Sequence, residues 1–197
     1  NLFSLEMRNR MNTRDRQREE TKKRIYQEAF KLFDQYGYDK VKVSDIAKAA
    51  KVSVGSVYYH YKNKEAIIDY GYYEFDQLLK EAYEKQTFDS EREAILFLID
   101  FQIKDVFLDI GLKMTTICFK NQINAENTYL HSDERYLYQK LLENLNNIQH
   151  MNKEHAAKMM LRISRGSIYD WCCHNGSYDL IEAVHEEISI VLDYIGL

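Results

Sequence analysis

The chain has 197 residues, with no proline, seven glycines and a formal net charge of −4 at pH 7. This length allows one or two domains with a hydrophobic core, and the shortage of proline and glycine favours helices over strands. No apolar run approaches the length of a membrane span, and residues 1–11 lack the apolar stretch of a signal peptide, so we expect neither membrane insertion nor export.

Charge is unevenly distributed along the chain. Residues 1–64 carry 15 Lys and Arg against 8 Asp and Glu, whereas residues 65–197 carry 12 against 23. A basic N-terminal third beside an acidic remainder predicts a polyanionic partner that binds at one end of the chain.

The cysteines are Cys118, Cys172 and Cys173. Their odd number and spacing do not suggest a disulfide framework, which favours a reducing cytoplasmic location. Cys172, Cys173 and His174 invite a metal-site interpretation, but consecutive helical residues point about 100° apart and cannot converge on one tetrahedral ion. We therefore expect small buried side chains here, with a thiol sensor as the alternative, and no metal or cofactor.

The N-terminal third predicts three helices. Apolar residues recur at helical spacing over residues 14–36, and Gly37 follows where a left-handed C-cap would lie. Ser44 is expected to cap a short helix over residues 45–50, and Ser53 a second one that begins at the next residue.

The remaining two-thirds also follow a helical pattern. Asn63 is expected to cap a helix that runs to about residue 85, and Ser90 with Glu93 forms a capping box for a helix that ends near residue 107. Further helices are expected over about 109–125, 133–150, 153–175 and 178–195, the last one capped by Ser177. The pattern predicts an all-α protein of about nine helices, with one domain over residues 1–64 and a second over residues 65–197.

Two short helices joined by a tight turn are typical of a helix-turn-helix. The small and aliphatic residues that would let these helices cross closely are Ile46, Ala47, Ala50, Val52 and Val57. Gly55 and Ser56 keep the leading edge of the second helix low enough to approach a phosphate backbone or base edges. An ordinary helical hairpin in a core is the alternative, and the positive charge of this third favours DNA binding.

The stretch VSDIAKAAKVSVGSVYYHYKNKEAII, residues 43–68, resembles the DNA-binding region of the TetR-type bacterial repressors. The matching positions are Ser44 for the family's threonine, Ile46, Ala47, Ala50, Val52, Ser53, Gly55, Tyr58, His60, Tyr61 for its phenylalanine, Lys64 and Ile67. The resemblance covers roughly residues 20–70. It is weaker elsewhere, where GSIYDWCCHNGSYDL resembles a segment near the last two helices of many relatives. Lys51 stands where the family usually has glycine, and a left-handed lysine there would cost about 1 kcal/mol.

The resemblance implies a three-helix DNA-binding domain followed by a helical effector-binding and dimerisation domain. It further implies a repressor that binds a pseudo-palindromic double-stranded operator as a homodimer and is released by a small-molecule effector, without enzymatic activity. The alternatives are a small helical enzyme whose N-terminal hairpin only packs, and a non-specific DNA-binding protein.

The second short helix carries the expected DNA contacts. Val57 and Tyr61 lie four residues apart and should face inward, which leaves Tyr58 and Tyr59 toward the groove; a core position for Tyr58 is the alternative. The full expected set is Ser44, Lys51, Ser53, Val54, Gly55, Ser56, Tyr58, Tyr59, His60 and Lys64. Lys64 would join the backbone amides at the start of its helix in an anion site.

A basic arm precedes the first helix. The arginines that could track a neighbouring groove are Arg8, Arg10, Arg14 and Arg16. The alternative is a solvated helix start in which Glu19 and Glu20 pair with basic neighbours.

The acidic domain is rich in aromatic residues and shows no nucleotide-binding glycine loop, HExxH or CxxC motif. We expect Phe101, Phe119, Tyr138 and Trp171 to line an effector cavity that suits an apolar or aromatic ligand, with a cationic drug as the alternative. The last two helices carry apolar faces that should pair with their twofold mates in a four-helix interface. The residues of these faces are Met159, Ile163, Ile181, Val184, Ile188 and Val191.

Overall fold

The computed structural model describes residues 13–124 and 129–197, except for the side chains of residues 105, 106, 123 and 124. The described residues form nine α-helices and three short helical segments, with no strand among them, which confirms the predicted all-α class. None of the described helices is both long and apolar enough to cross a bilayer. The chain divides into two compact units, residues 1–70 and 71–197, and this division falls inside the helix that the sequence predicted to begin after Asn63.

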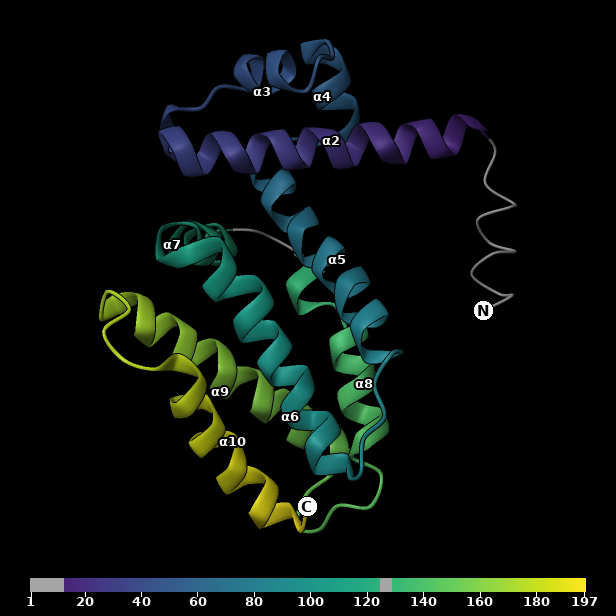
Figure 1. The fold of residues 1–197 in the computed structure, drawn as a ribbon, viewed down its shortest axis with the longest axis vertical. Coiled ribbons are helices and arrows are strands. Elements are labelled where there is room, and N and C mark those ends of the chain that lie inside the picture. The colour runs from purple at the N-terminus through teal and green to yellow at the C-terminus, as the bar shows by residue number, and fades with distance from the viewer. Residues whose placement is uncertain (1–12, 125–128) are drawn as a thin grey trace. The chain divides into compact units, whose positions relative to one another are not determined.

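The first unit consists of three helices and the start of a fourth, and Figure 1 shows their arrangement. Its elements are α2 (Thr13–Tyr36), the 3₁₀ turn η1 (Tyr38–Lys40), α3 (Val43–Ala49), α4 (Val54–His60) and the first residues of α5 (Lys64–Tyr83). Ile25, Ala29 and Phe33 of α2 are fully buried at a spacing of four residues, so they form one stripe, and α3 and α4 pack against this helix. Burying each large side chain of that stripe stabilises the unit by about 1.5–3 kcal/mol.

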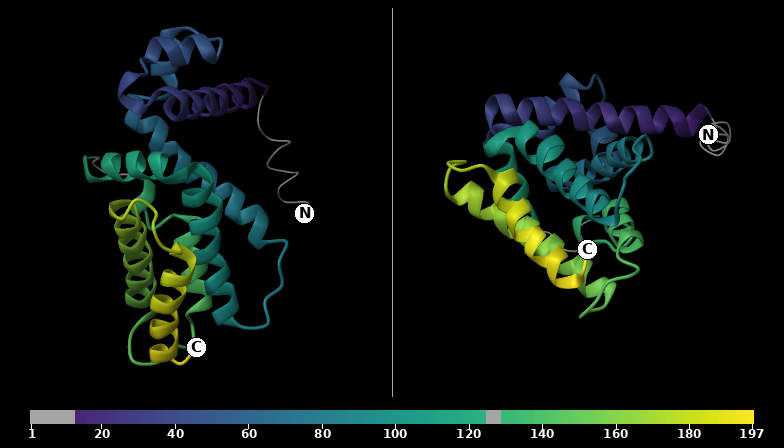
Figure 2. Two further views of the ribbon diagram at one scale, coloured as in Figure 1. Left: turned by 60° about the vertical axis from the view of Figure 1, so that its left-hand side comes forward. Right: turned by 60° about the horizontal axis from the view of Figure 1, so that its bottom comes forward.

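The second unit holds the remaining helices (Figures 1 and 2). They are the rest of α5, α6 (Glu91–Gln102), the π-helical segment η2 (Ile103–Leu108), α7 (Asp109–Asn124), the 3₁₀ turn η3 (Tyr129–His131), α8 (Tyr136–Asn144), α9 (Lys153–Cys173) and α10 (Leu180–Ile195). As predicted, α6 is largely buried. Helices α9 and α10 lie side by side in both figures.

Two expected helix caps are wrong. Helix α3 begins at Val43 instead of Asp45, because the Asp45 carboxylate accepts a hydrogen bond from the Lys42 backbone N–H at 2.9 Å, and this leaves Ser44 exposed in the first turn. Helix α10 is capped by Asp179 and not by Ser177: the Asp179 carboxylate accepts from the backbone N–H groups of Ile181 and Glu182, at 3.0 and 3.1 Å. The predicted caps at Ser53, Asn63 and Ser90 are confirmed.

The helix predicted to end near residue 107 does not continue as an α-helix. It widens into π-helical turns at Ile103, and the following helix is kinked at Gly111, whose φ of 75° is accessible to glycine at little cost. The buried Thr115 hydroxyl donates to the carbonyl oxygens of Phe107 and Gly111, each at 3.0 Å. These bonds satisfy carbonyl groups beside the kink.

The core of the second unit contains three residues that the sequence assigned to a subunit interface. Val184 and Ile188 of α10 are fully buried among the side chains of their own unit, so their proposed place at a dimer surface is wrong, whereas Val191 is buried but also lines a groove on the outer surface of α9 and α10. The face of α10 that remains exposed carries Ile190, with 70% of its surface accessible, and Tyr194. The period of the apolar pattern was right, but the stripe that faces the core and the stripe that faces outward are adjacent on this helix.

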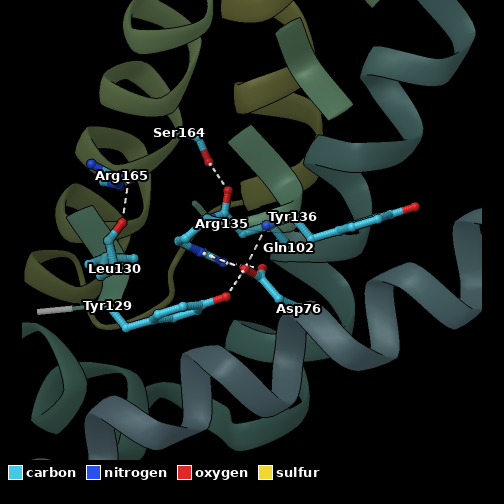
Figure 3. Close-up of polar contacts among 8 residues, drawn as sticks. All are labelled: Asp76, Gln102, Tyr129, Leu130, Arg135, Tyr136, Ser164 and Arg165. Carbon is cyan, nitrogen blue, oxygen red and sulfur yellow. Dashed lines mark hydrogen bonds and ion pairs between the residues drawn. The ribbon is translucent and has the colours of Figure 1, made fainter. Parts of the chain in front are cut away.

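A buried ion pair lies between α5 and the start of α8 (Figure 3). The Asp76 carboxylate is fully buried and accepts hydrogen bonds from Arg135 Nη2 at 2.8 Å and Arg135 Nε at 3.2 Å. It also accepts from the Tyr129 hydroxyl at 2.9 Å and the Tyr136 backbone N–H at 3.0 Å. With four donors around it, this buried charge has both its ion partner and its hydrogen bonds.

Candidate nucleic-acid interface

The turn between α3 and α4 has the tight geometry that the sequence predicted. Lys51 adopts a left-handed conformation with φ of 55°, the conformation expected for a residue that replaces glycine. The Val52 backbone N–H donates to the Ala47 carbonyl at 3.0 Å, which closes the turn behind it. From α2, Arg24 Nε donates to the Ala50 carbonyl at 3.0 Å. The turn is therefore held from both sides, and the Lys51 side chain is exposed on it.

Helix α4 separates its aromatic residues by face, as predicted. Val57 and Tyr61 are buried, whereas Tyr58 and Tyr59 expose 55% and 67% of their surface. The alternative of a core position for Tyr58 is therefore wrong. Val54 is also exposed at the first turn, beside the exposed Gly55. The outward surface of α4 carries a methyl-bearing side chain and two phenols, which suit contacts with thymine methyl groups and phosphates.

The Ser53 hydroxyl accepts a hydrogen bond from the Ser56 backbone N–H at 3.0 Å. This cap fixes the first turn of α4 and therefore the direction in which the helix leaves the turn. Ser53 is exposed and Ser56 is half-buried, so the start of the helix presents small polar side chains at its surface. At the other end of α4, the Tyr61 hydroxyl donates to the Lys22 carbonyl of α2 at 2.9 Å.

A groove of about 440 Å³ separates the N-terminal half of α2 from α4. Arg14 and Arg18 line it from α2, and Ser56, Tyr59 and His60 line it from α4. The Arg18 guanidinium lies over the Tyr59 ring, 5.4 Å from its centre. These residues bring two guanidinium groups to the exposed face of α4, where a phosphate backbone would need them.

The surroundings of His60 alter the pKa of its imidazole, which the sequence alone did not indicate. Partial burial, and then the nearby charges of Arg18 and Lys22, lower the pKa of its imidazole below the ordinary value. These surroundings favour the neutral imidazole, which can still donate to a phosphate through its ring N–H.

The Lys64 ammonium group forms hydrogen bonds within its own unit. Its Nζ donates to the carbonyl oxygens of Tyr38 at 2.8 Å and Val41 at 3.0 Å, and it lies 4.2 Å from the centre of the Tyr38 ring. These contacts fasten the start of α5 to the connection between α2 and α3. The role predicted for Lys64 as a phosphate ligand stays a prediction, and this geometry gives the side chain a structural role in addition.

The basic arm is only partly within the described residues. Arg8 and Arg10 lie outside them, Arg14 lines the groove, and Arg16 Nε pairs with Glu20 at 3.0 Å. The alternative of a solvated helix start with internal ion pairs therefore describes Arg16 well. Sequence reasoning missed Arg18. The spacing of Arg14, Arg18 and Thr21 would have indicated that these residues line one side of the groove, since positions separated by four and seven residues share one helix face.

The residues predicted to line an effector cavity do not all come together. Phe101 packs against Phe75 and Phe97, and Phe119 packs against Phe107 and Tyr169. The Trp171 indole N–H donates to the Tyr178 carbonyl at 3.2 Å and braces the turn between α9 and α10. Tyr138 lines a cavity of about 230 Å³, and the other three do not line it.

The cysteines differ in environment. Cys118 is buried, Cys172 is half-buried and Cys173 is exposed, so the expectation of buried small side chains is wrong for Cys173. Burial raises the pKa of the Cys118 thiol to about 12 and also raises that of Cys172. A thiol needs a lowered pKa to react readily, so neither of these two has the environment of a sensor.

Comparison with known proteins identifies the first unit. The model of the family described as bacterial regulatory proteins, tetR family, matches residues 25–70, which contain the whole of α3 and α4. This region of the chain is therefore similar to the DNA-binding part of the tetR family. As in the resemblance that the sequence suggested, the match ends within α5.

Individual relatives match the chain over different lengths. The A-factor receptor protein of Streptomyces griseus is 42% identical over 48 residues, which are 24% of the chain and 17% of that relative. The biofilm operon icaADBC HTH-type negative transcriptional regulator IcaR of Staphylococcus epidermidis is 27% identical over 124 residues, which are 57% of the chain and 66% of that relative. The alignments therefore cover less than two thirds of these relatives.

A solved structure shares the fold more widely. The transcriptional regulator FadR from Bacillus subtilis, in complex with stearoyl-CoA, matches with a TM-score of 0.61 and covers 87% of the chain and 98% of that structure. At 19% identity, this likeness shows a common fold.

Proposed function

We propose that this protein is a transcriptional regulator of the TetR type that represses by binding a pseudo-palindromic DNA operator as a homodimer. The observation that carries the proposal is the exposed face of α4, with Tyr58 and Tyr59 beside the guanidinium groups of Arg14 and Arg18. Phenols and exposed apolar groups would contact base edges, while the arginines and Lys51 would contact phosphates. The predicted contacts of Ser44, Ser53, Val54, Gly55, Ser56 and His60 belong to the same proposal.

The proposal includes a dimer that forms through α9 and α10. Two helix-turn-helix units must lie one turn of DNA apart, about 34–36 Å, to occupy successive major grooves. A groove of about 650 Å³ on the outer surface of α9 and α10 supports this interface, since Met159, Ile163 and Ile190 line it together with the side-chain-free Gly166. Its charged lining residues are Arg162, Asp170 and Glu187. A second copy of the same helix pair would cover these apolar groups in an isologous contact.

Release by a small-molecule effector in the second unit is part of the same proposal. An effector that binds one conformation 100-fold better than the other shifts their equilibrium by about 2.7 kcal/mol. Because DNA and effector would favour different conformations, each would weaken the binding of the other. The structure of B. subtilis FadR in complex with stearoyl-CoA supports a ligand in a protein of this fold, and the predicted preference for an apolar or aromatic effector remains a proposal.

The test starts from a pool of random DNA duplexes, from which the purified chain selects its own ligands. We expect a pseudo-palindromic sequence to be enriched and then to bind with a mobility shift. Tyr58→Ala and Tyr59→Ala should weaken that binding by about tenfold each, because each loses a base or phosphate contact. Tyr36→Ala is the matched control, since Tyr36 is also 55% exposed in the same unit but lies at the far end of α2.

Three outcomes contradict the proposal. If the pool yields no preferred sequence and the binding falls steeply with salt, the protein is a non-specific DNA-binding protein. If no duplex is bound at any salt concentration, the DNA-binding function is wrong and the helical-enzyme alternative returns. Equal loss of binding in Tyr36→Ala and Tyr58→Ala would remove α4 from its assigned role.

A further inference from the structure

A cavity in the second unit has a lining that the effector prediction did not anticipate. It lies between the segment around η3 and the middle of α9, with a volume of about 230 Å³. Four cationic side chains, Arg135, Lys158, Arg162 and Arg165, line it together with a single carboxylate, that of Asp133. This lining places more positive than negative charge at the cavity, in an otherwise acidic unit, and positive charge attracts anions.

Two of these four cations already have carboxylate partners. Arg135 is paired with Asp76 in the buried ion pair, and Lys158 Nζ lies 3.8 Å from the Asp133 carboxylate in an exposed pair. Among the described residues, neither Arg162 nor Arg165 forms a salt bridge. The cavity lining therefore carries two positive charges without a carboxylate partner among the described side chains: the half-buried Arg165, and Arg162, which is exposed and also lines the groove on the outer surface of α9 and α10.

Arg165 is the more constrained of the two (Figure 3). Its Nη2 donates to the Leu130 carbonyl at 3.2 Å, and its Nη1 lies 3.4 Å from His131 Nδ1. Its Nε is buried and has no hydrogen-bond partner among the described residues. Burial, and then the charge of Arg135, lower the pKa of the guanidinium to about 10, so it remains charged at pH 7. Keeping a charge partly buried without a counter-ion is costly, and an anion would remove that cost.

We propose that this cavity binds the anionic group of a small molecule, a carboxylate or a phosphate, through Arg165 and Arg162. Guanidinium groups match the oxygen geometry of both anions and form stronger hydrogen bonds with them than with neutral acceptors. The volume is below the range of about 300–1,000 Å³ that holds a whole drug-sized ligand, so the cavity suits a small anion or the charged end of a larger molecule. Tyr138 and Leu161 supply an apolar wall beside the charges.

Isothermal titration calorimetry of the full chain tests this site with two probes, inorganic phosphate and octanoate, at an ionic strength held constant with chloride. We expect saturable binding of at least one probe. Arg165→Gln and Arg162→Gln should each weaken it by about tenfold or more, because each removes charge-assisted hydrogen bonds to the anion. The probe that binds better distinguishes a phosphate-bearing ligand from a carboxylate-bearing one.

Lys153→Gln is the matched control, since it removes one positive charge from the same helix at a position that does not line the cavity. Its affinity for the probe should equal that of the unchanged protein. Arg165→Lys keeps the charge but loses the planar fork, and should show intermediate affinity. If Arg165→Gln does not fold, as judged by circular dichroism, Arg162→Gln and Arg165→Lys still decide the question.

The proposal is overturned if neither probe binds at millimolar concentration, or if the Arg162 and Arg165 variants bind with unchanged affinity. It is also overturned if Lys153→Gln weakens binding as much as they do, because the effect would then come from overall charge. The measurement involves no DNA, so its result is independent of the operator experiment.

Discussion

The Tyr61 hydroxyl donates a hydrogen bond to the Lys22 carbonyl oxygen at 2.9 Å, and thereby ties the end of α4 to the middle of α2. The Tyr61 ring is buried at the same time. One side chain therefore combines an apolar contact with a polar one, and sets the position of the helix whose outer face carries Tyr58 and Tyr59.

Replacing Tyr61 by phenylalanine should lower the free energy of unfolding by about 0.5–1.5 kcal/mol, since it removes this hydrogen bond and retains the ring. Urea denaturation followed by circular dichroism measures the loss. Tyr59→Phe is the control, because the Tyr59 side chain is exposed and its change should have little effect. Equal stabilities of the two variants would mean that the Tyr61 hydroxyl contributes nothing.

Lys64→Met should destabilise the protein by about 1–3 kcal/mol, because the carbonyl oxygens of Tyr38 and Val41 both lose their donor. Lys62→Met makes the same change of charge two residues away at an exposed position, and should leave the stability unchanged. Thermal unfolding of both variants makes the comparison. If Lys64→Met weakens DNA binding and leaves stability at the level of Lys62→Met, its ammonium acts mainly on phosphate.

Asp76→Asn should cost about 3–5 kcal/mol of stability, since it leaves the buried Arg135 guanidinium without a counter-charge. Asp133→Asn is the matched control: its partner Lys158 is 3.8 Å away and both side chains are exposed, so we expect a loss below about 1 kcal/mol. Chemical denaturation of the two variants distinguishes these values. A loss of similar size in both would contradict the importance of the buried pair.

Ile190→Glu should convert the proposed dimer into monomers, because a carboxylate would have to be buried at the interface. Sedimentation equilibrium gives the mass directly. Leu78→Glu introduces the same charge at another exposed aliphatic residue, on α5, and should leave the mass of the assembly unchanged. A dimer that persists in Ile190→Glu would place the interface elsewhere.

Cys118 should resist iodoacetamide in the folded protein at pH 8, because burial both blocks access and raises the pKa of its thiol to about 12. The exposed Cys173 should be modified first. Mass spectrometry of digested protein identifies the modified residue, and unfolding in guanidinium should make all three cysteines react. Modification of Cys118 at the rate of Cys173 in the folded state would contradict its buried position.

The helix-turn-helix could be predicted from sequence because its determinants are local. The small residues of α3, the Ser53 cap and the left-handed turn at Lys51 all lie within about ten residues of one another. Val57 and Tyr61 are four residues apart and therefore share the buried face, whereas Tyr58 and Tyr59 fall on the exposed one. The periodic spacing of apolar residues in the sequence is enough to predict such local features.

Other features depend on distant partners, which periodicity does not report. Asp76 resembles an ordinary polar position of an amphipathic helix, and only the fold brings Arg135 to it across 59 positions of sequence. The internal role of Lys64 and the unpaired Nε of Arg165 arise in the same way. On α10, the pattern identified apolar residues, but the choice between core and surface requires knowledge of the neighbouring helix.

The π-helical segment at residues 103–108 has a consequence for how sequences of different length could adopt this fold. Each of its hydrogen-bonded turns encloses one residue more than an α-helical turn, so the segment holds surplus backbone between the end of α6 and the kink at Gly111. Deleting a single residue there would let α6 continue in α geometry toward the kink. An alignment of homologues should therefore concentrate its one-residue gaps at this segment.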